Sequence, residues 1–598
     1  MLREIINFTK SISPESYIFR LEPVEGIHIQ IKLDDNGQQI DHQFAFYKKG
    51  FEVTKFLKDC LNRQIHTIYI SMNKAFDSKK KIHSCSPFCI AFKIQNITEV
   101  QSRFDDYFKI AEKYCEKEEQ KKWSNLFNKY SSDELVKLIK EDIEKVVDEQ
   151  TKKDKRFKLS DKFYVYSYLS NIASEDYENV HQKYLTEAVF NKAEYNKPID
   201  DEIFGVSDYL SGYNVKKPFL QHQTASFNLN FRFNNSDALQ LFMFSQLQDN
   251  RLLPNPLPIF IDKQELNDTV VKIFNREGGK KISYSDIIKE VYERERDLGN
   301  YYLFNYFGKT VRDFDFVSSF SYKFEPALAI EDIFNIKKGV QEIIKDIFRF
   351  EKYIVQKIFD NQLIQKTKDD SWRLRYFDDI EYKPQYIRAP MYQLIFKYRK
   401  AFYDYVYKSK REALNSRIFR DIMQTGILDN LKEDKYENKH HTKEYQIKEK
   451  LNIWFSLYEF FDQQKNKNGE ETMANKIKQL LERMRDVASD ENQHLESDDE
   501  FAYAAGQVIY YLLSRSEAAE KSHALLEPFL QKADLVQFKM AISRIFNQYK
   551  HDIKFYKGRF EKLMAEVLSF EIEKSLKDLM PMILAGYFAD NVIYKKNQ

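Results

Sequence analysis

Glycine, proline and cysteine are scarce in this sequence, which contains 15, 13 and 4 of them among 598 residues. So few glycines and prolines exclude a linker-rich or disordered chain and predict mostly regular secondary structure. Four cysteines in a chain of this length do not make a disulfide framework. Long apolar runs are missing too, since the stretch from Met582 to Ala589 is far too short to span a bilayer. We therefore expect a cytoplasmic protein that does not contact a membrane.

A large net charge is also absent, because 94 lysines and arginines face 92 acidic residues and leave a net charge of +2. This balance argues against a surface that coats nucleic acid non-specifically, but it leaves room for local basic patches. Aromatic residues, in contrast, are plentiful, with 49 phenylalanines and 39 tyrosines. Together with 43% hydrophobic residues they predict several well-packed cores, and the length suits three or four domains.

The pattern of apolar residues predicts an α+β multidomain protein. Alternation at Ile27, Ile29 and Ile31, followed by a turn, is typical of a β-hairpin. Further alternation at 301–306 and 311–317 predicts a second hairpin, and from about residue 327 the pattern becomes helical. The expected regions are an N-terminal α/β domain (1–155), a central α/β region with antiparallel strands (156–325), a helical region (326–465) and a C-terminal helical bundle (470–598).

The stretch from Glu500 to Lys532 is the most informative part of the chain. Apolar residues at three- and four-residue spacing predict one stripe of a helix that begins at Asp498 and Asp499. Periodicity alone indicates no more than two core helices of a bundle.

The wording of several blocks is more specific than their periodicity. The blocks are GQ at 506–507, YYLLSRS at 510–516, K-x-H-x-LLEPFL at 521–530, KPFLQHQT at 217–224, LPNPLPIFID at 253–262, NYYLFNYF from Asn300 and DFDFV from Asp313. Together they resemble the large-subunit family of type I-B CRISPR surveillance complexes (Cascade). The resemblance covers roughly residues 215 to 595, and the first 200 residues carry no block of this kind.

This resemblance implies a non-catalytic subunit in antiviral defence. Such a subunit sits at the 5′-handle end of the crRNA, senses the short motif beside the target in double-stranded DNA, stabilises the R-loop and recruits a helicase-nuclease. Its other partners are the backbone, handle-binding and small subunits. The C-terminal bundle would resemble the small subunit, and the family's habit of encoding that subunit internally predicts a separate product starting near Met473.

Four groups of residues are candidates for nucleic-acid contact. Two loops offer backbone and cations for reading duplex DNA: Gly278, Gly279, Lys280 and Lys281 in one, and Lys216, Lys217, His222 and Gln223, beside the strand carrying Arg232, in the other. Two further groups combine cations with aromatics, which suits phosphates and unpaired bases. The first contains Lys397, Arg399, Lys400, Lys408, Lys410 and Arg411 among Tyr398, Phe402, Tyr403, Tyr405 and Tyr407. The second lies between Lys539 and Lys562 and includes Lys550, Lys554, Lys557 and Arg559. The competing interpretation is that the aromatics are core and the charges a solvated face.

Signatures of catalysis are thin. The sequence has no P-loop, no G-x-S-x-G motif and no zincin motif. Asp313 and Asp315 would share one face of a strand and hold Mg²⁺ in a nuclease, but no third acid, histidine or lysine stands at a recognisable spacing. We predict that the chain is not an enzyme. A metal-dependent nuclease built on these two acids, and a helical adaptor that binds no nucleic acid, remain the alternatives.

Metal ligands are equally thin. Cys85 and Cys89, with His83 nearby, lack the fourth ligand that a structural zinc site needs. His440 and His441 lie in a polar stretch and are expected to be a solvated pair. We predict no metal and no cofactor.

Overall fold

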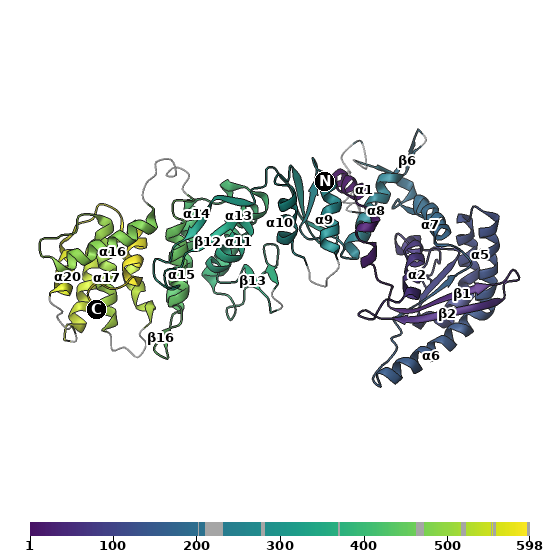
Figure 1. The fold of residues 1–598 in the computed structure, drawn as a ribbon, viewed down its shortest axis with the longest axis horizontal. Coiled ribbons are helices and arrows are strands. Elements are labelled where there is room, and N and C mark those ends of the chain that lie inside the picture. Colours follow the sequence, from purple (N-terminus) through teal and green to yellow (C-terminus); the bar gives the residue numbers. More distant parts are fainter. Residues whose placement is uncertain are drawn as a thin grey trace. The chain divides into compact units, whose positions relative to one another are not determined.

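The computed structural model describes residues 1–200, 202–209, 226, 231–276, 282–368, 371–461, 472–515, 522–551, 553 and 558–594 (Figure 1). The chain divides into two compact units, Met1–Asp315 and Phe316–Gln598. Helices and sheets occur together, and the C-terminal part is helical, so the α+β prediction is confirmed. None of the helices in the described ranges is both long and apolar enough to cross a membrane.

A four-stranded sheet organises the start of the first unit, in the order β2-β1-β4-β3. Its strands are β1 (Gly26–Leu33), β2 (Gln39–Tyr47), β3 (Cys89–Lys93) and β4 (Tyr164–Leu169). β1 runs antiparallel to β2 and parallel to β4, while β3 runs antiparallel to β4. The predicted hairpin is confirmed, because β1 pairs antiparallel with β2. The alternating Ile27, Ile29 and Ile31 are fully buried along β1. Residues of this core also come from α2 (Lys55–Gln64), α3 (Ile97–Val100), α4 (Phe104–Ala111), α5 (Glu118–Tyr130), α6 (Val136–Lys153) and α7 (Ser174–Ala188).

The remainder of the first unit contains two three-stranded sheets, β5-β6-β7 and β10-β9-β8. Their strands are β5 (Lys197–Ile199), β6 (Glu202–Gly205), β7 (Phe233–Asn234), β8 (Leu257–Phe260), β9 (Tyr301–Phe307) and β10 (Thr310–Val317), and the division between the units falls on the last of these. The helices here are α1 (Leu2–Lys10), α8 (Asn235–Asp249), α9 (Glu265–Asn275) and α10 (Tyr284–Arg294). β9 and β10 confirm the second predicted hairpin.

The second unit begins with short strands that the sequence did not predict. β11 (Lys323–Ile330) pairs with β12 (Glu342–Asp346), β13 (Ile364–Lys366) with β14 (Trp372–Leu374), and β15 (Tyr436–Glu437) with β16 (His440–His441). The expectation that the chain is helical from about residue 327 is therefore wrong in these segments. β13 to β16 span only two or three residues and show no period, and β11 contains Pro326, a residue type that argues against a strand. The helices here are α11 (Ile347–Phe350), α12 (Gln356–Ile358), α13 (Ala389–Lys408), α14 (Ser416–Glu433) and α15 (Glu444–Ser456).

The end of the chain forms the predicted helical bundle. Its helices are α16 (Met473–Ser489), α17 (Asp498–Ser514), α18 (Glu527–Leu530), α19 (Leu535–Tyr549), α20 (Arg559–Ser569) and α21 (Leu576–Phe588). α17 is buried on all sides from Phe501 to Ile509, so it is a central helix and not the one-striped helix that the spacing predicted. Its N-cap is Ser497, whose hydroxyl accepts from the Glu500 amide, and the predicted Asp498 and Asp499 lie inside the first turn.

Two glycines allow α17 and α21 to cross with their backbones in contact. A Cβ atom on Gly506 would lie 2.2 Å from the Ile583 carbonyl oxygen, and one on Gly586 would lie 2.0 Å from the Tyr503 carbonyl oxygen. Next to the crossing, the buried Gln507 side chain donates to the Gly586 carbonyl at 2.5 Å. The GQ pair at 506–507 thus serves close helix packing.

Candidate nucleic-acid interface

The aromatic residues singled out on α13 belong to the protein core. Tyr398, Phe402, Tyr403, Tyr405 and Tyr407 are each 8% exposed or less. The Tyr405 ring lies 5.5 Å from that of Phe350, and the Phe402 ring 5.1 Å from that of Phe359. For these five rings the competing interpretation is therefore correct: they pack the interior and are closed to nucleic-acid bases.

A different set of rings on and beside α13 is open to solvent. Phe396 is 66% exposed, Tyr386 72% and Tyr382 44%. Tyr382 and Tyr392 have ring centroids 5.3 Å apart, and Tyr392 and Phe396 have centroids 6.2 Å apart with planes 27° apart. We call Tyr382, Tyr392 and Phe396 the aromatic surface.

Cations border the aromatic surface. The Arg399 guanidinium lies 5.3 Å from the Phe396 ring centroid and donates to the Asp378 carbonyl at 2.7 Å. Lys400 is 73% exposed at its side chain and Lys397 is 62% exposed.

Each of these two lysines has an acidic partner in the same unit. Lys397 pairs with Asp421 at 2.8 Å and Lys400 with Asp404 at 2.9 Å. The hydrogen bond to Asp421 raises the pKa of Lys397, which stays cationic at neutral pH. Ion pairs made by such exposed lysines contribute little stability, and Asp404 keeps the buried Lys408 as a second partner. Lys397 and Lys400 can therefore turn to a phosphate at small cost.

The other cations predicted on this segment differ in position. Lys408 lies in the last turn of α13, where its side chain is fully buried and pairs with Asp404 at 2.9 Å. Lys408 is thus not a surface contact, contrary to the prediction. Lys410 is half-buried and Arg411 exposed, both just beyond the helix.

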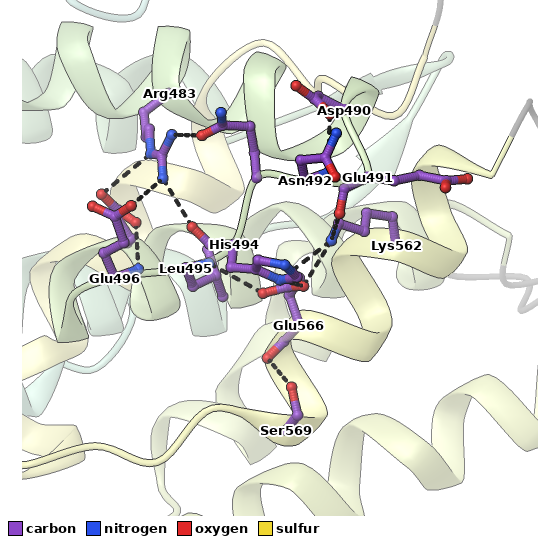
Figure 2. A network of polar contacts seen from close by, with 12 residues as sticks. Arg483, Asp490, Glu491, Asn492, His494, Leu495, Glu496, Lys562, Glu566 and Ser569 are labelled. Atoms are coloured by element: carbon purple, nitrogen blue, oxygen red, sulfur yellow. Dashed lines mark hydrogen bonds and ion pairs between the residues drawn. The ribbon is translucent and has the colours of Figure 1, made fainter.

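The C-terminal cations are largely occupied by the bundle itself. In Figure 2, Lys562 of α20 points toward Glu566 and the Glu491 carbonyl, at 2.9 and 3.1 Å. Lys539 is 13% exposed at its side chain and pairs with Glu571, and Arg559 donates to the Val592 carbonyl at 3.3 Å. These three cations hold loops and helices of the bundle together.

Two further C-terminal candidates, Lys554 and Lys557, lie outside the described residues, while Lys550 is exposed at the end of α19. The predicted basic face is therefore reduced, within the described part, to exposed positions such as Arg544 and Lys550.

The two loops predicted to read duplex DNA fall outside the described residues. This applies to Lys216, Lys217, His222 and Gln223, and to Gly278, Gly279, Lys280 and Lys281. Arg232 is described: it is half-buried and donates from Nε to the Tyr195 carbonyl at 2.8 Å.

The two acids of the nuclease alternative lie on β10, both half-buried at alternate positions. In the described part of the chain, neither Asp313 nor Asp315 belongs to a group of three ligands close enough to hold a metal ion. All four cysteines are buried and free. His441 overturns the expectation of a solvated histidine pair, because it is half-buried and binds Asp434 at 2.8 Å, while His440 is exposed.

Compared with protein-family models, with curated proteins and with solved structures, the chain has no match.

The sequence analysis did not predict the aromatic surface, although the spacing of its residues along the chain indicates it. Tyr392, Phe396 and Arg399 recur at four and three residues and so share one face of α13, while the buried Leu394 and Tyr398 lie away from that face.

Proposed function

We propose that this chain is a non-catalytic large subunit of a CRISPR RNA-guided DNA surveillance complex. The blocks between residues 215 and 595 support the family, and one observation supports nucleic-acid binding: exposed aromatic rings beside exposed cations on α13. The proposed partners are crRNA, target double-stranded DNA, the backbone, handle-binding and small subunits, and a helicase-nuclease.

The aromatic surface suits unpaired nucleotides better than duplex. Bases in a duplex are already stacked on each other, whereas a single strand presents free faces that stack on tyrosine and phenylalanine. Lys397 and Lys400 add charge for the phosphates of the same strand. In an opened target this role falls to a strand of the R-loop, and reading of the flanking motif is assigned to other parts of the chain.

The test is binding of a labelled single-stranded oligonucleotide by the full chain at low salt. Phe396→Ala should weaken binding by about 1–3 kcal/mol, the usual contribution of one stacked base. Phe19→Ala is the matched control, since Phe19 is 47% exposed in the first unit. Equal affinity of the Phe396 variant and wild type would show that the aromatic surface does not bind the oligonucleotide, and would contradict the proposal.

The two alternatives predict other outcomes in the same experiment. A nuclease built on Asp313 and Asp315 would cut the oligonucleotide when Mg²⁺ is added. A helical adaptor without nucleic-acid contact would bind neither single-stranded nor double-stranded DNA at any salt concentration. Assembly with a guide RNA and the other subunits then separates a surveillance complex from a free-standing binding protein.

A further inference from the structure

Three metal-ligating side chains of the second unit meet away from the aromatic surface. One ligand atom from each of Asp434, His441 and His523 lies within 4.8 Å of the other two. Asp434 and His523 are buried, and His441 is half-buried. We propose that these residues form a binding site for a divalent transition-metal ion of the zinc class, held by one carboxylate and two imidazoles.

The local backbone explains why these residues meet. Asn438 and Lys439 adopt positive φ angles of 48° and 66°, which turns β15 tightly into β16. This turn brings His441 back beside Asp434, and the Asp434 carboxylate also accepts from the Lys443 amide at 2.9 Å. The carboxylate and its histidine are thus preset by a short hairpin.

The third ligand comes from the bundle. The His523 backbone amide donates to Asp434 Oδ2 at 2.8 Å, which fixes the start of this segment against the hairpin. The Tyr587 hydroxyl lies 3.1 Å from His523 Nδ1, while His523 Nε2 is buried and has no hydrogen-bond partner among the described residues. A second partner on the other ring nitrogen is the usual way in which a protein orients a metal-binding imidazole.

The charges around the cluster suit a divalent cation. The Asp434 carboxylate accepts hydrogen bonds from His441 and from the backbone amides of His523 and Lys443, which hold it beside the two imidazoles. Glu444, which pairs with Lys448 at 2.6 Å, adds a second carboxylate close to both histidines.

Tyr587, whose hydroxyl lies 3.1 Å from His523 Nδ1, also lines a cavity of about 250 Å³ together with Glu444, Lys448 and Tyr510, although none of the three ligands lines it. The fourth ligand of a four-coordinate ion would be a water. Imidazole and carboxylate ligands of this number are typical of Zn²⁺, and Co²⁺ occupies the same kinds of site.

Binding requires one movement. The imidazoles of His441 and His523 are stacked, with centroids 3.7 Å apart and planes 17° apart, and parallel rings do not aim lone pairs at one ion. The half-buried His441 therefore leaves the stack and turns toward the ion, while His523 stays buried.

The experiment is calorimetric titration of the chelator-treated full chain with ZnCl₂, followed by CoCl₂ with visible absorption as the second readout. Wild type should bind about one equivalent, give the ligand-field bands of four-coordinate Co²⁺, and melt at a higher temperature with Zn²⁺. His441→Gln removes a half-buried ligand and should weaken binding by about tenfold or more and abolish the rise in melting temperature.

His440→Gln is the matched control, since this neighbour is exposed on the same hairpin, and it should behave like wild type. His523→Gln tests the buried ligand, with far-ultraviolet circular dichroism to check folding. If wild type binds no zinc, or if His441→Gln binds as tightly as wild type, the site does not exist.

Discussion

Gly506 of α17 and Gly586 of α21 face each other where the two helix backbones touch. A Cβ on either residue would lie 2.0–2.2 Å from a carbonyl oxygen of the other helix. Backbone atoms cannot rotate away as a side chain can, so the helices must separate to accept even one methyl group.

Gly506→Ala should therefore lower the free energy of unfolding of the second unit by about 3 kcal/mol. Gly426→Ala is the matched control, because Gly426 is also a buried helical glycine. Its new Cβ would meet the flexible tip of Lys450 at 3.2 Å and the Ile358 carbonyl only at an ordinary contact distance of 3.7 Å. The measurement is chemical denaturation of both variants. A loss for Gly506→Ala no larger than that for Gly426→Ala would contradict the crossing.

A buried carboxyl group makes stability depend on pH. Burial raises the pKa of Glu351 from 4.5 to about 7, although hydrogen bonds from Tyr376 at 2.8 Å and Tyr407 at 3.3 Å oppose the shift. A raised pKa means that the folded state holds the proton more tightly. The protonated Glu351 therefore contributes to the free energy of unfolding. This contribution is complete below pH 4.5 and is lost as the pH rises through about 7.

Glu351→Gln should remove this dependence. Between pH 5 and pH 8, wild type should lose on the order of 3 kcal/mol relative to the variant, the free energy that corresponds to the change in pKa. Thermal melting of both proteins at the two pH values measures it. Glu381→Gln, an exposed position, should give a constant difference from wild type. A constant difference for Glu351→Gln as well would show that the buried group does not titrate.

The cations beside the aromatic surface should appear in the salt dependence of binding. Replacing Lys397 and Lys400 by glutamine removes two phosphate contacts and should reduce the slope of log affinity against log salt by about 1.4 for single-stranded DNA. Lys117→Gln controls for charge loss elsewhere, since Lys117 is 63% exposed and paired with Asp176. An unchanged slope would place the phosphates away from α13.

Catalysis has a direct test. Asp313→Ala combined with Asp315→Ala should leave the purified chain no less active on DNA, because we expect no activity to lose. The assay is incubation of labelled DNA with Mg²⁺ or Mn²⁺. Metal-dependent cleavage by wild type that disappears in the double variant would establish the nuclease alternative.

An internal product starting near Met473 can also be tested. A product beginning at Met473 would lose the Thr472 cap of α16 and the hydrogen bond from the Met473 amide to Glu459 at 2.8 Å. It would also lose ion pairs with the preceding region, such as Lys478–Glu331 and Lys432–Glu527. Silencing Met473 and Met484 as start sites should remove a short polypeptide from the purified complex and lower its mass. An unchanged mass and an unchanged salt dependence would mean that the bundle acts only within the long chain.

Much of the architecture was readable from the sequence. Alternation before the turn at 34–37 gave the first hairpin, and long helical stripes gave the C-terminal bundle. Short strands such as β13 and β15 were not predictable, since two or three residues carry no period. Their pairing depends on the tertiary contacts around them.

The candidate site was harder to predict because burial is not a property of composition. The segment from Met391 to Arg420 was singled out for its cations and aromatics, but Tyr398 and Tyr407 are internal while Phe396 is exposed. Helical phase separates Tyr398 from Phe396, and counting aromatics and cations ignores phase. Tyr407, about three turns further along α13, shares the phase of Phe396 and is buried by what packs on the end of the helix, which phase does not reveal. The cluster around Asp434 was beyond reach, because His523 lies 82 positions beyond His441 and only folding brings them together.

The positions of the three ligands along the chain decide which translation product can bind zinc. Asp434 and His441 precede residue 462, whereas His523 belongs to the bundle. A bundle synthesised separately from Met473 would carry a single histidine of the three ligands and no site. If both products exist, only the full-length chain binds zinc. The amount of bound zinc then equals the amount of full-length chain, and comparing it with the total protein gives the ratio of the two products in the assembly.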